Sequence, residues 1–200
     1  MSALGESARM HFPPSRELQV LLHCARPQRS NEHAARAQAT IAEGLDWQDL
    51  LKRAAWHRML PLLHWHLSAA SFDAFPQDVR AALGNEFLRN AHRMLRLSAE
   101  LTGILSALRE CGVPALPYKG PMLAARLYSN LALRASGDLD ILVRRCDVAR
   151  ARDLLIERGY RPRYHLNEDQ LPFMLASRYS EAMVRADYSQ VELHWAFTNR

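Results

Sequence analysis

The hydrophobic period changes near Cys111, and no other feature of the sequence constrains the fold as strongly. Between Val79 and Glu110, apolar residues recur every three or four positions, which predicts one long amphipathic helix. Gly112 follows, and glycine is the usual residue at a left-handed helix end. Beyond it, short apolar runs alternate with turn residues, a pattern typical of strands. A helical block followed by such alternation predicts an α+β (α/β-like) fold.

The residues before the long helix predict shorter helices separated by prolines and polar caps. Ser15 and Asp46 are the expected N-caps of two of them. We expect helices at 16–25, at 31–43 and from Trp47 onward, a short helix or turn from Pro61, and a loop at 71–78. We therefore divide the chain into an α-helical N-terminal segment, residues 1–111, and a second unit, residues 112–200.

The second unit alternates between strand and helix patterns. Pro121 suits the first turn of a helix, and Asp147 is the expected cap of another helix, which Gly159 ends. The predicted strands are residues 113–116, 138–143, 160–166, 181–187 and 190–195.

The composition is that of a globular protein that attracts anions. Hydrophobic residues make up 48% of the chain and charged residues 24%, which suffices for a packed core. The formal net charge of +5 favours anionic partners such as nucleotides, and RNA is a further candidate. Lys52 and Lys119 are the only lysines among 26 basic residues. Arginine does not replace a compact ammonium group at a tight phosphate site, so the two lysines are of interest.

The cysteines and the lack of long apolar runs bear on the compartment. Cys24, Cys111 and Cys146 have no CxxC spacing, so we interpret them as reduced thiols, two of them buried near helix ends. The N-terminal residues lack a basic start followed by an apolar run, and no stretch approaches ~18 apolar residues. The sequence therefore predicts a cytoplasmic protein without a signal peptide or a membrane span.

Two aspartates stand on the strand predicted at 138–143. Side chains alternate along a strand, so Asp138 and Asp140 share one face while Leu139 and Ile141 share the other. Neighbouring carboxylates repel one another unless a cation lies between them, and Mg²⁺ accepts such oxygens while leaving room for phosphates. A solvated strand end carries the same spacing, so both interpretations of this motif stay open.

The residues before the aspartates favour the metal interpretation. Gly120 permits close approach of the backbone to a phosphate, Pro121 marks a helix N-terminus that attracts anions, and Lys119 adds a point charge. Ser136 and Gly137 directly precede the acids as further phosphate-binding candidates. Arg134, four residues before Asp138, either binds a phosphate or pairs with the acids. Together these residues predict a phosphate cradle that faces a metal platform.

The stretch from Lys119 to Tyr160 resembles the uncharacterised nucleotidyltransferase family of bacteria, within the DNA polymerase β-like superfamily. A weaker likeness extends over residues 50–195, including VELHW near the end. The matching residues are Lys119, Gly120, Leu123, Tyr128, Arg134, Gly137, Asp138, Asp140, Val143, Asp147, Ala151, Leu155, Gly159 and Tyr160.

The resemblance implies a small mixed sheet flanked by helices, with Asp138 and Asp140 holding Mg²⁺ (or Mn²⁺). A third carboxylate on another strand is expected to complete the site and to draw a proton from the acceptor. We favour Glu192 for this role, with Glu181 and Asp187 as alternatives.

The sequence departs from the superfamily pattern in three ways. Lys119 and Gly120 stand where Gly-Ser is usual, glutamate at position 192 replaces the usual aspartate, and the chain stops at Arg200 where relatives continue. The part that grips the base or the acceptor is therefore expected to be missing.

The leading functional hypothesis is a metal-dependent nucleotidyltransferase that moves a nucleoside monophosphate from a triphosphate such as ATP to a hydroxyl. The acceptor is a small molecule, a protein or RNA. An alternative is a catalytically weak nucleotidyltransferase-like binding module of a toxin–antitoxin or regulatory system, with a protein partner. A metal phosphohydrolase is a third interpretation.

Four histidines could suggest metal binding. His57, His64 and His66 have no Cys or Asp at ligand spacing, so we expect packed or half-exposed side chains. His194 shares the face of Glu192 by strand alternation, and it either approaches the metal and phosphates or supports the sheet.

Overall fold

The computed structural model describes residues 14–68, 75–164, 170–187 and 189–198. The N-terminal segment 1–13, the first half of the predicted loop at 71–78 and the end of the predicted strand at 160–166 lie outside this range. No helix among the described residues is both long enough and apolar enough to cross a bilayer.

The N-terminal part is helical, as predicted. Its helices are α1 (Arg16–Cys24), α2 (Asn31–Ala42), α3 (Trp47–Trp56), α4 (Leu60–Ser68) and α5 (Gln77–Glu110). Ser15 caps α1 by accepting from the Leu18 amide, and Asp46 caps α3 by accepting from the first turn of that helix. Gly112, with φ of +67°, follows the end of α5.

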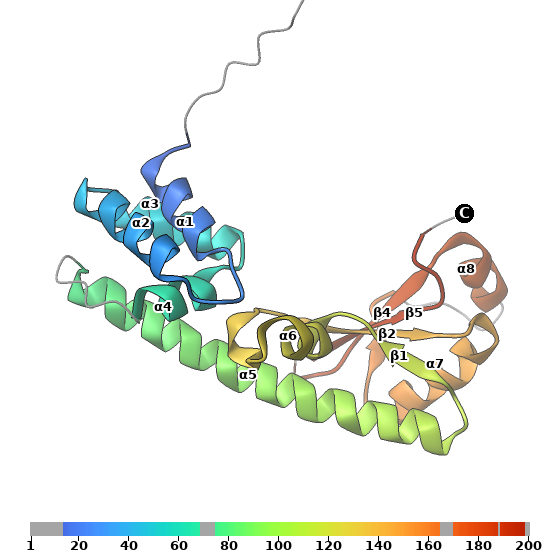
Figure 1. The fold of residues 1–200 in the computed structure, drawn as a ribbon. Coiled ribbons are helices and arrows are strands. Elements are labelled where there is room, and N and C mark those ends of the chain that lie inside the picture. The colour runs from blue at the N-terminus through green and yellow to red at the C-terminus, as the bar shows by residue number, and fades with distance from the viewer. Residues whose placement is uncertain (1–13, 69–74, 165–169, 188, 199–200) are drawn as a thin grey trace, which may run out of the picture.

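Helix α5 spans the whole molecule and joins two hydrophobic clusters (Figure 1). Its first half, including Val79 and Leu83, packs with α1, α3 and α4. Its second half, from Met94 to Leu108, packs under the sheet. The division of the chain at residue 111 remains a prediction, and the described contacts place half of α5 with the sheet.

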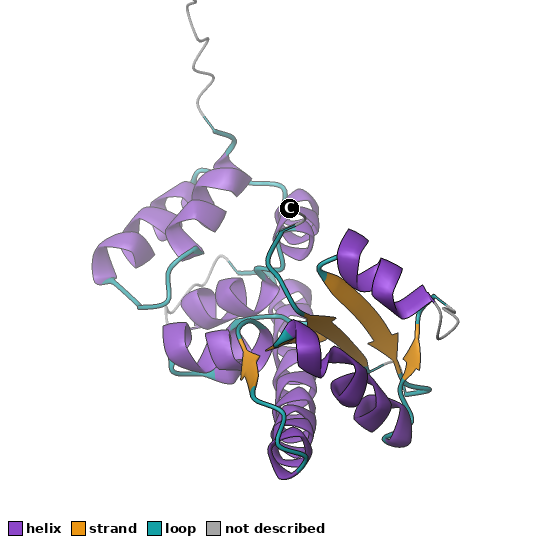
Figure 2. Cartoon of the chain, turned by 90° about the vertical axis from the view of Figure 1, so that its right-hand side faces the viewer, coloured by secondary structure: helices purple, strands orange, loops and turns teal. Residues whose placement is uncertain are grey.

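The C-terminal part contains a five-stranded mixed sheet, confirming the predicted α+β class. Its order is β1-β2-β5-β4-β3; β2 and β5 are parallel, and the other neighbours are antiparallel. The strands lie together, apart from the α1–α4 helices (Figure 2). The strands are β1 (Ala115–Pro117), β2 (Asp138–Val143), β3 (Arg161–Pro162), β4 (Ser180–Val184) and β5 (Gln190–His194). The remaining helices are α6 (Gly120–Tyr128), η1 (Leu131–Leu133), η2 (Arg145–Asp147), α7 (Val148–Glu157) and α8 (Leu171–Ser177).

The two faces of the sheet differ in chemistry. Leu139 and Ile141 of β2 and Leu193 of β5 are buried in one cluster with α5 and α7. The alternate residues of these strands, including Asp140 and Glu192, point to the opposite face. One face therefore builds the core, and the other presents charged groups.

Two expectations about single side chains need correction. Asp147 stands at the N-cap position of α7, as predicted, but its carboxylate makes no capping hydrogen bond, because it accepts from Arg144 Nε at 2.6 Å and from Arg150. Only Cys24 is buried, which raises the pKa of its thiol to about 12. Cys111 and Cys146 are exposed because the helix end and the surface turn that carry them are uncovered.

Candidate metal and nucleotide site

The pairing of β2 with β5 brings two acids together that are far apart in the sequence. Asp140 lies opposite Glu192, and Leu142 lies opposite His194. Because directly opposite residues share a face, Asp140, Glu192 and His194 gather on the face away from the core. The side chain of Asp140 is only 2% exposed, whereas that of Glu192 is 28% exposed.

Asp140 is the centre of the polar contacts at this site. Its Oδ1 accepts a hydrogen bond from Lys119 Nζ at 3.0 Å and lies 3.2 Å from His194 Nε2. The same Nε2 is 3.5 Å from Glu192 Oε2, and Ser180 Oγ donates to Glu192 Oε1 at 2.8 Å. His194 Nδ1 is buried without a hydrogen-bond partner among the described residues. This arrangement favours the tautomer whose Nε2–H donates to Asp140.

The contacts of Asp140 keep it ionised. Burial alone would raise the pKa of Asp140, but the hydrogen bonds from His194 and Lys119 outweigh burial and hold the pKa below its usual range. The same hydrogen bond to Asp140 raises the pKa of Lys119. Burial and the Asp140 charge raise the pKa of Tyr118. The site therefore presents a buried anion rather than a neutral acid.

The turn at Gly120 lies against the backbone of β2. Gly120 has a left-handed φ of +55°, and a Cβ there would lie 3.2 Å from the Asp138 carbonyl oxygen. Arg134 Nη1 donates to the Gly120 carbonyl at 3.3 Å, so this arginine supports the turn. Ser136 Oγ lies 3.4 Å from Asp138 Oδ1. The predicted cradle residues thus surround the start of β2.

Three groups of this face fit a divalent cation. One ligand atom each from Asp140, Glu192 and His194 lies within 4.8 Å of the others. The two carboxylates suit Mg²⁺ or Mn²⁺, whereas an imidazole ligand suits a transition metal better than Mg²⁺. Asp138 lies opposite Gln190, two residues before Asp140 along β2, and is not part of this group. His194 is therefore a potential ligand for which the sequence left two interpretations open.

The other two candidates for the third carboxylate lie elsewhere. Glu181 is buried on the core side of β4, where its Oε2 lies 3.2 Å from Arg152 Nε. Burial raises the pKa of Glu181 despite this arginine. Asp187 lies in the turn after β4 and pairs with Arg185, which lowers the Asp187 pKa. Of the three candidates, Glu192 is the one next to Asp140.

Aromatic rings surround His194, and the sequence did not single them out. The Tyr118 ring meets His194 edge-on at a centroid distance of 5.2 Å and Phe197 at 5.4 Å. Tyr179 stacks on His194 at 6.2 Å. The position of Tyr118 directly before Lys119 is the one sequence signal for this cluster. His57, His64 and His66 belong to no group of three metal-binding side chains in the described part of the chain.

An α+β domain with acidic side chains on adjacent strands, beside a lysine–glycine helix start, has the architecture of a nucleotidyltransferase core. Residues 43–200 match the model of a family described as an uncharacterised nucleotidyltransferase, and the chain belongs to that family. The match begins before α3, so it includes helices of the N-terminal part as well as the sheet. No curated protein and no solved structure gives a significant match.

Proposed function

We propose that the chain transfers a nucleoside monophosphate from a nucleoside triphosphate to a hydroxyl group and releases pyrophosphate. The observation that carries the proposal is the position of Asp140 opposite Glu192 on two parallel strands, within reach of Lys119. Family membership supports the general class of reaction.

Divalent cations, Mg²⁺ or Mn²⁺, would be held by Asp138, Asp140 and Glu192. Bound there, such ions neutralise phosphate charge and stabilise both the attacking and the leaving oxygen. Asp138 would reach these ions from its position two residues before Asp140 on β2. His194 holds Asp140 Oδ1 in place and is the alternative third ligand.

The residues around the Gly120 turn would bind the triphosphate. Lys119 is 48% exposed, so its ammonium group can move from Asp140 to a phosphate oxygen. Gly120 starts α6, whose first amides attract anions. Arg134, Ser136 and Gly137 complete this cradle.

Glu192 is the proposed proton acceptor. A general base must lie within hydrogen-bond reach of the hydroxyl that it deprotonates. Glu192 is partly exposed and bonded to Ser180, so it is both accessible and oriented. Asp140, whose side chain is 2% exposed, is too deeply buried for this role.

Transfer of label from radiolabelled triphosphates, with Mg²⁺ or Mn²⁺ present, tests the proposal. Asp138→Asn and Asp140→Asn should each abolish transfer, whereas Asp153→Asn, an exposed matched control on α7, should leave it intact. Release of inorganic phosphate without transfer would instead identify a phosphohydrolase.

One observation favours the alternative, a catalytically weak binding module. The ammonium group of Lys119 already neutralises Asp140, as a metal ion would. A binding module would show no transfer, and the Asp138→Asn, Asp140→Asn double variant would keep its affinity for a protein partner.

A further inference from the structure

A cationic cavity lies between the N-terminal helices and the turn before β2. Its volume is about 390 Å³, within the usual range for small-molecule sites. The turn between α3 and α4, one face of α5 and the segment before Asp138 form its walls. The lining residues are Ala55, Arg58, Leu60, Pro61, Glu86, Arg93, Ala135, Ser136 and Gly137.

Two arginines give this cavity its charge. No hydrogen bond or ion pair engages the side chains of Arg58 and Arg93 within the described residues, and both residues are exposed. The one acid of the lining, Glu86, already accepts from Arg89 at 2.5 and 3.1 Å. Two free guanidinium groups in one cavity are suited to a phosphate, which they bind through paired N–H donors.

The backbone at Arg58 is in a conformation that normally selects glycine. Arg58 has φ of +55°, its amide donates to the Ala55 carbonyl at 3.0 Å, and the Met59 amide donates to the Ala54 carbonyl at 2.7 Å. This is the Schellman pattern at the end of α3, where a residue with a Cβ is strained. The chain thus carries an arginine where glycine would fit with less strain, and that arginine lines the cavity. Strain of this kind points to a role for the side chain.

Ser136 and Gly137 link the cavity to the proposed active site. Ser136 lines the cavity, and its hydroxyl lies 3.4 Å from Asp138 Oδ1. A Cβ on Gly137 would meet no atom within 4 Å, so the wall is open at that point. A group bound in the cavity would therefore lie beside the first acid of β2.

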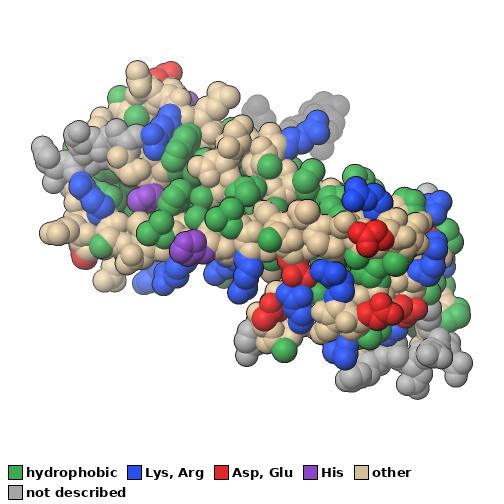
Figure 3. All heavy atoms as spheres, turned by 90° about the horizontal axis from the view of Figure 1, so that it is seen from below, with side chains coloured by type: hydrophobic (Ala, Val, Ile, Leu, Met, Phe, Trp, Pro, Cys, Tyr) green, Lys and Arg blue, Asp and Glu red, His purple; other side chains and the backbone are tan. Residues whose placement is uncertain are grey.

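The surrounding surface of α5 is basic as well. On the face seen in Figure 3, the helical half shows Lys and Arg side chains with few acids, and the sheet half mixes the two. Arg89, Arg93 and Arg96 follow one another at helical spacing, with His92 between them. Glu86 and Glu100 are the nearest acids on this helix before and after them.

We propose that the cavity lined by Arg58 and Arg93 binds a phosphate group of the acceptor. The inference rests on the proposed function, in which the Lys119–Gly120 turn takes the triphosphate. Ser136 and Gly137 then lie between the two substrates, and the arginine side of the cavity is left for the second one. The acceptor is then a phosphorylated molecule, either a nucleic-acid strand or a phosphorylated metabolite.

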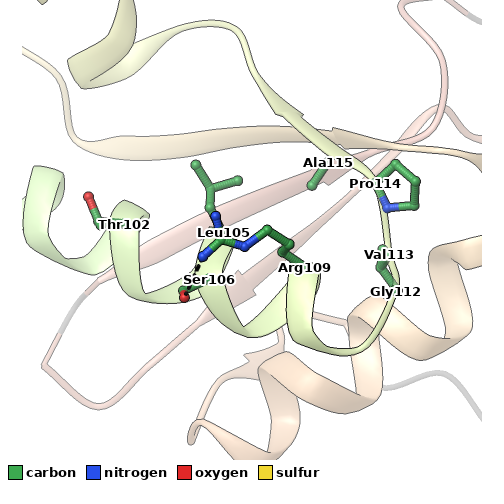
Figure 4. A pocket seen from close by; sticks show the side chains of 8 residues that line it. All are labelled: Thr102, Leu105, Ser106, Arg109, Gly112, Val113, Pro114 and Ala115. Carbon is green, nitrogen blue, oxygen red and sulfur yellow. Dashed lines mark hydrogen bonds between the residues drawn. The ribbon is translucent and has the colours of Figure 1, made fainter.

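A larger groove at the other end of α5 supplies the contrast. It encloses about 630 Å³ and is lined mainly by α5 and by residues 112–115 (Figure 4). Its arginine, Arg109, lies 3.4 Å from Ser106 Oγ, to which it donates. Arg109→Gln is therefore the matched control, because it removes a cavity-lining arginine from the same helix.

Binding measurements on the full chain test the proposal. The probes are ribose 5-phosphate against ribose, a 5′-phosphorylated RNA hexamer against its 5′-hydroxyl form, and a non-hydrolysable ATP analogue with Mg²⁺. We expect Arg58→Gly and Arg93→Gln each to weaken the binding of a phosphorylated probe at least about tenfold. Loss of a charge-assisted hydrogen bond has an effect of this size. The ATP analogue should bind these variants and Arg109→Gln as it binds the unaltered chain.

Arg58→Gly separates function from folding. Glycine removes the strain of the left-handed backbone at this position. The variant should therefore melt at the same temperature as the unaltered chain or higher, while it binds the phosphorylated probe more weakly. If the variants lose affinity only for the phosphorylated RNA hexamer, the acceptor is a nucleic-acid strand. If they lose affinity only for ribose 5-phosphate, the acceptor is a phosphorylated metabolite. Unchanged binding of both phosphorylated probes, or an equal loss of the ATP analogue, would overturn the proposal. Failure of the proposed function would appear separately, as absent transfer by the unaltered chain.

Discussion

The two faces of the sheet each bury a carboxylate beside a cation, with opposite results. On the face away from the core, here called the open face, Asp140 accepts hydrogen bonds from Lys119 and His194. On the core face, Glu181 lies 3.2 Å from Arg152, but neither of its oxygens has a hydrogen-bond partner among the described residues. Burial raises the pKa of both carboxyls, and only at Asp140 do the partners outweigh it.

The difference shows that proximity of opposite charge is not enough to prepare an acid for metal binding. A carboxylate must receive hydrogen bonds in its ionised form to stay charged when it is buried. Asp140 receives two such hydrogen bonds, whereas burial raises the pKa of Glu181 despite Arg152. The contrast separates a candidate catalytic acid from a structural ion pair more sharply than burial does.

The largest expected effect is on activity. Asp140→Asn should lower the rate of label transfer by at least about a thousandfold, which corresponds to a barrier higher by roughly 4 kcal/mol. The reason is that the site loses a negative charge that binds the cations on which the phosphates depend. Glu181→Gln, on the opposite face, should change transfer by less than about threefold in protein that remains folded. Equal losses in both variants would remove the functional distinction between the faces.

The next effect is on folding stability. Leu193→Ala, on the core face of β5, should lower the free energy of unfolding by about 3 kcal/mol, because it leaves a cavity in a fully buried site. Leu142→Ala, on the open face of β2, should cost less than about 1 kcal/mol. Urea unfolding of both variants measures the comparison, and a costlier Leu142 substitution would contradict the assignment of the core face.

A smaller effect concerns the pH dependence that Lys119 confers. Because the folded-state pKa of Asp140 is lowered, its ionisation stabilises the fold above about pH 4, and this contribution is lost as the pH falls through the folded-state pKa. Lys119→Met should raise that pKa, so the loss begins at higher pH. The contribution should stay below about 1 kcal/mol, since Lys119 is half-exposed. Urea unfolding between pH 2 and 6 measures the effect. The control, Lys52→Met, should show the same dependence of unfolding free energy on pH as the unaltered chain.

The smallest effect has the opposite sign. The folded-state pKa of Glu181 is raised, so its contribution to stability is larger at low pH and declines as the pH rises through that pKa. The difference in unfolding free energy between the unaltered chain and Glu181→Gln should therefore shrink as the pH rises from about 4. A difference that grows over this range would show that Arg152 outweighs burial after all.

Local patterns predicted the elements that depend on neighbouring residues. The period of α5, the caps Ser15 and Asp46, and the alternation along β2 all follow from residues within a few positions of one another. Helix α8, seven residues long, escaped prediction because Met174, the one buried side chain among those described in it, gives no repeating pattern.

The site itself depends on pairing between distant segments, which local patterns do not encode. Asp140 and His194 are 54 positions apart and meet only because β2 and β5 are parallel in one register. A separate pairing, that of β1 with β2, brings Lys119 onto Asp140. Sequence could name Asp140 and Glu192 as candidates, but it could not decide between ligand and supporting roles for His194.

Helix α5 sets the angle as well as the distance between the two hydrophobic clusters. Its 34 residues span about 50 Å, and each residue turns the helix by about 100°. One residue inserted at its middle would therefore swing Arg58 to another side of the sheet and break the contacts of α4 and α5 with η1. Seven inserted residues would nearly restore the orientation while moving the arginine about 10 Å away. The geometry between Arg58 and Asp138 thus depends on the number of residues in α5 as well as on the contacts of α4 with η1.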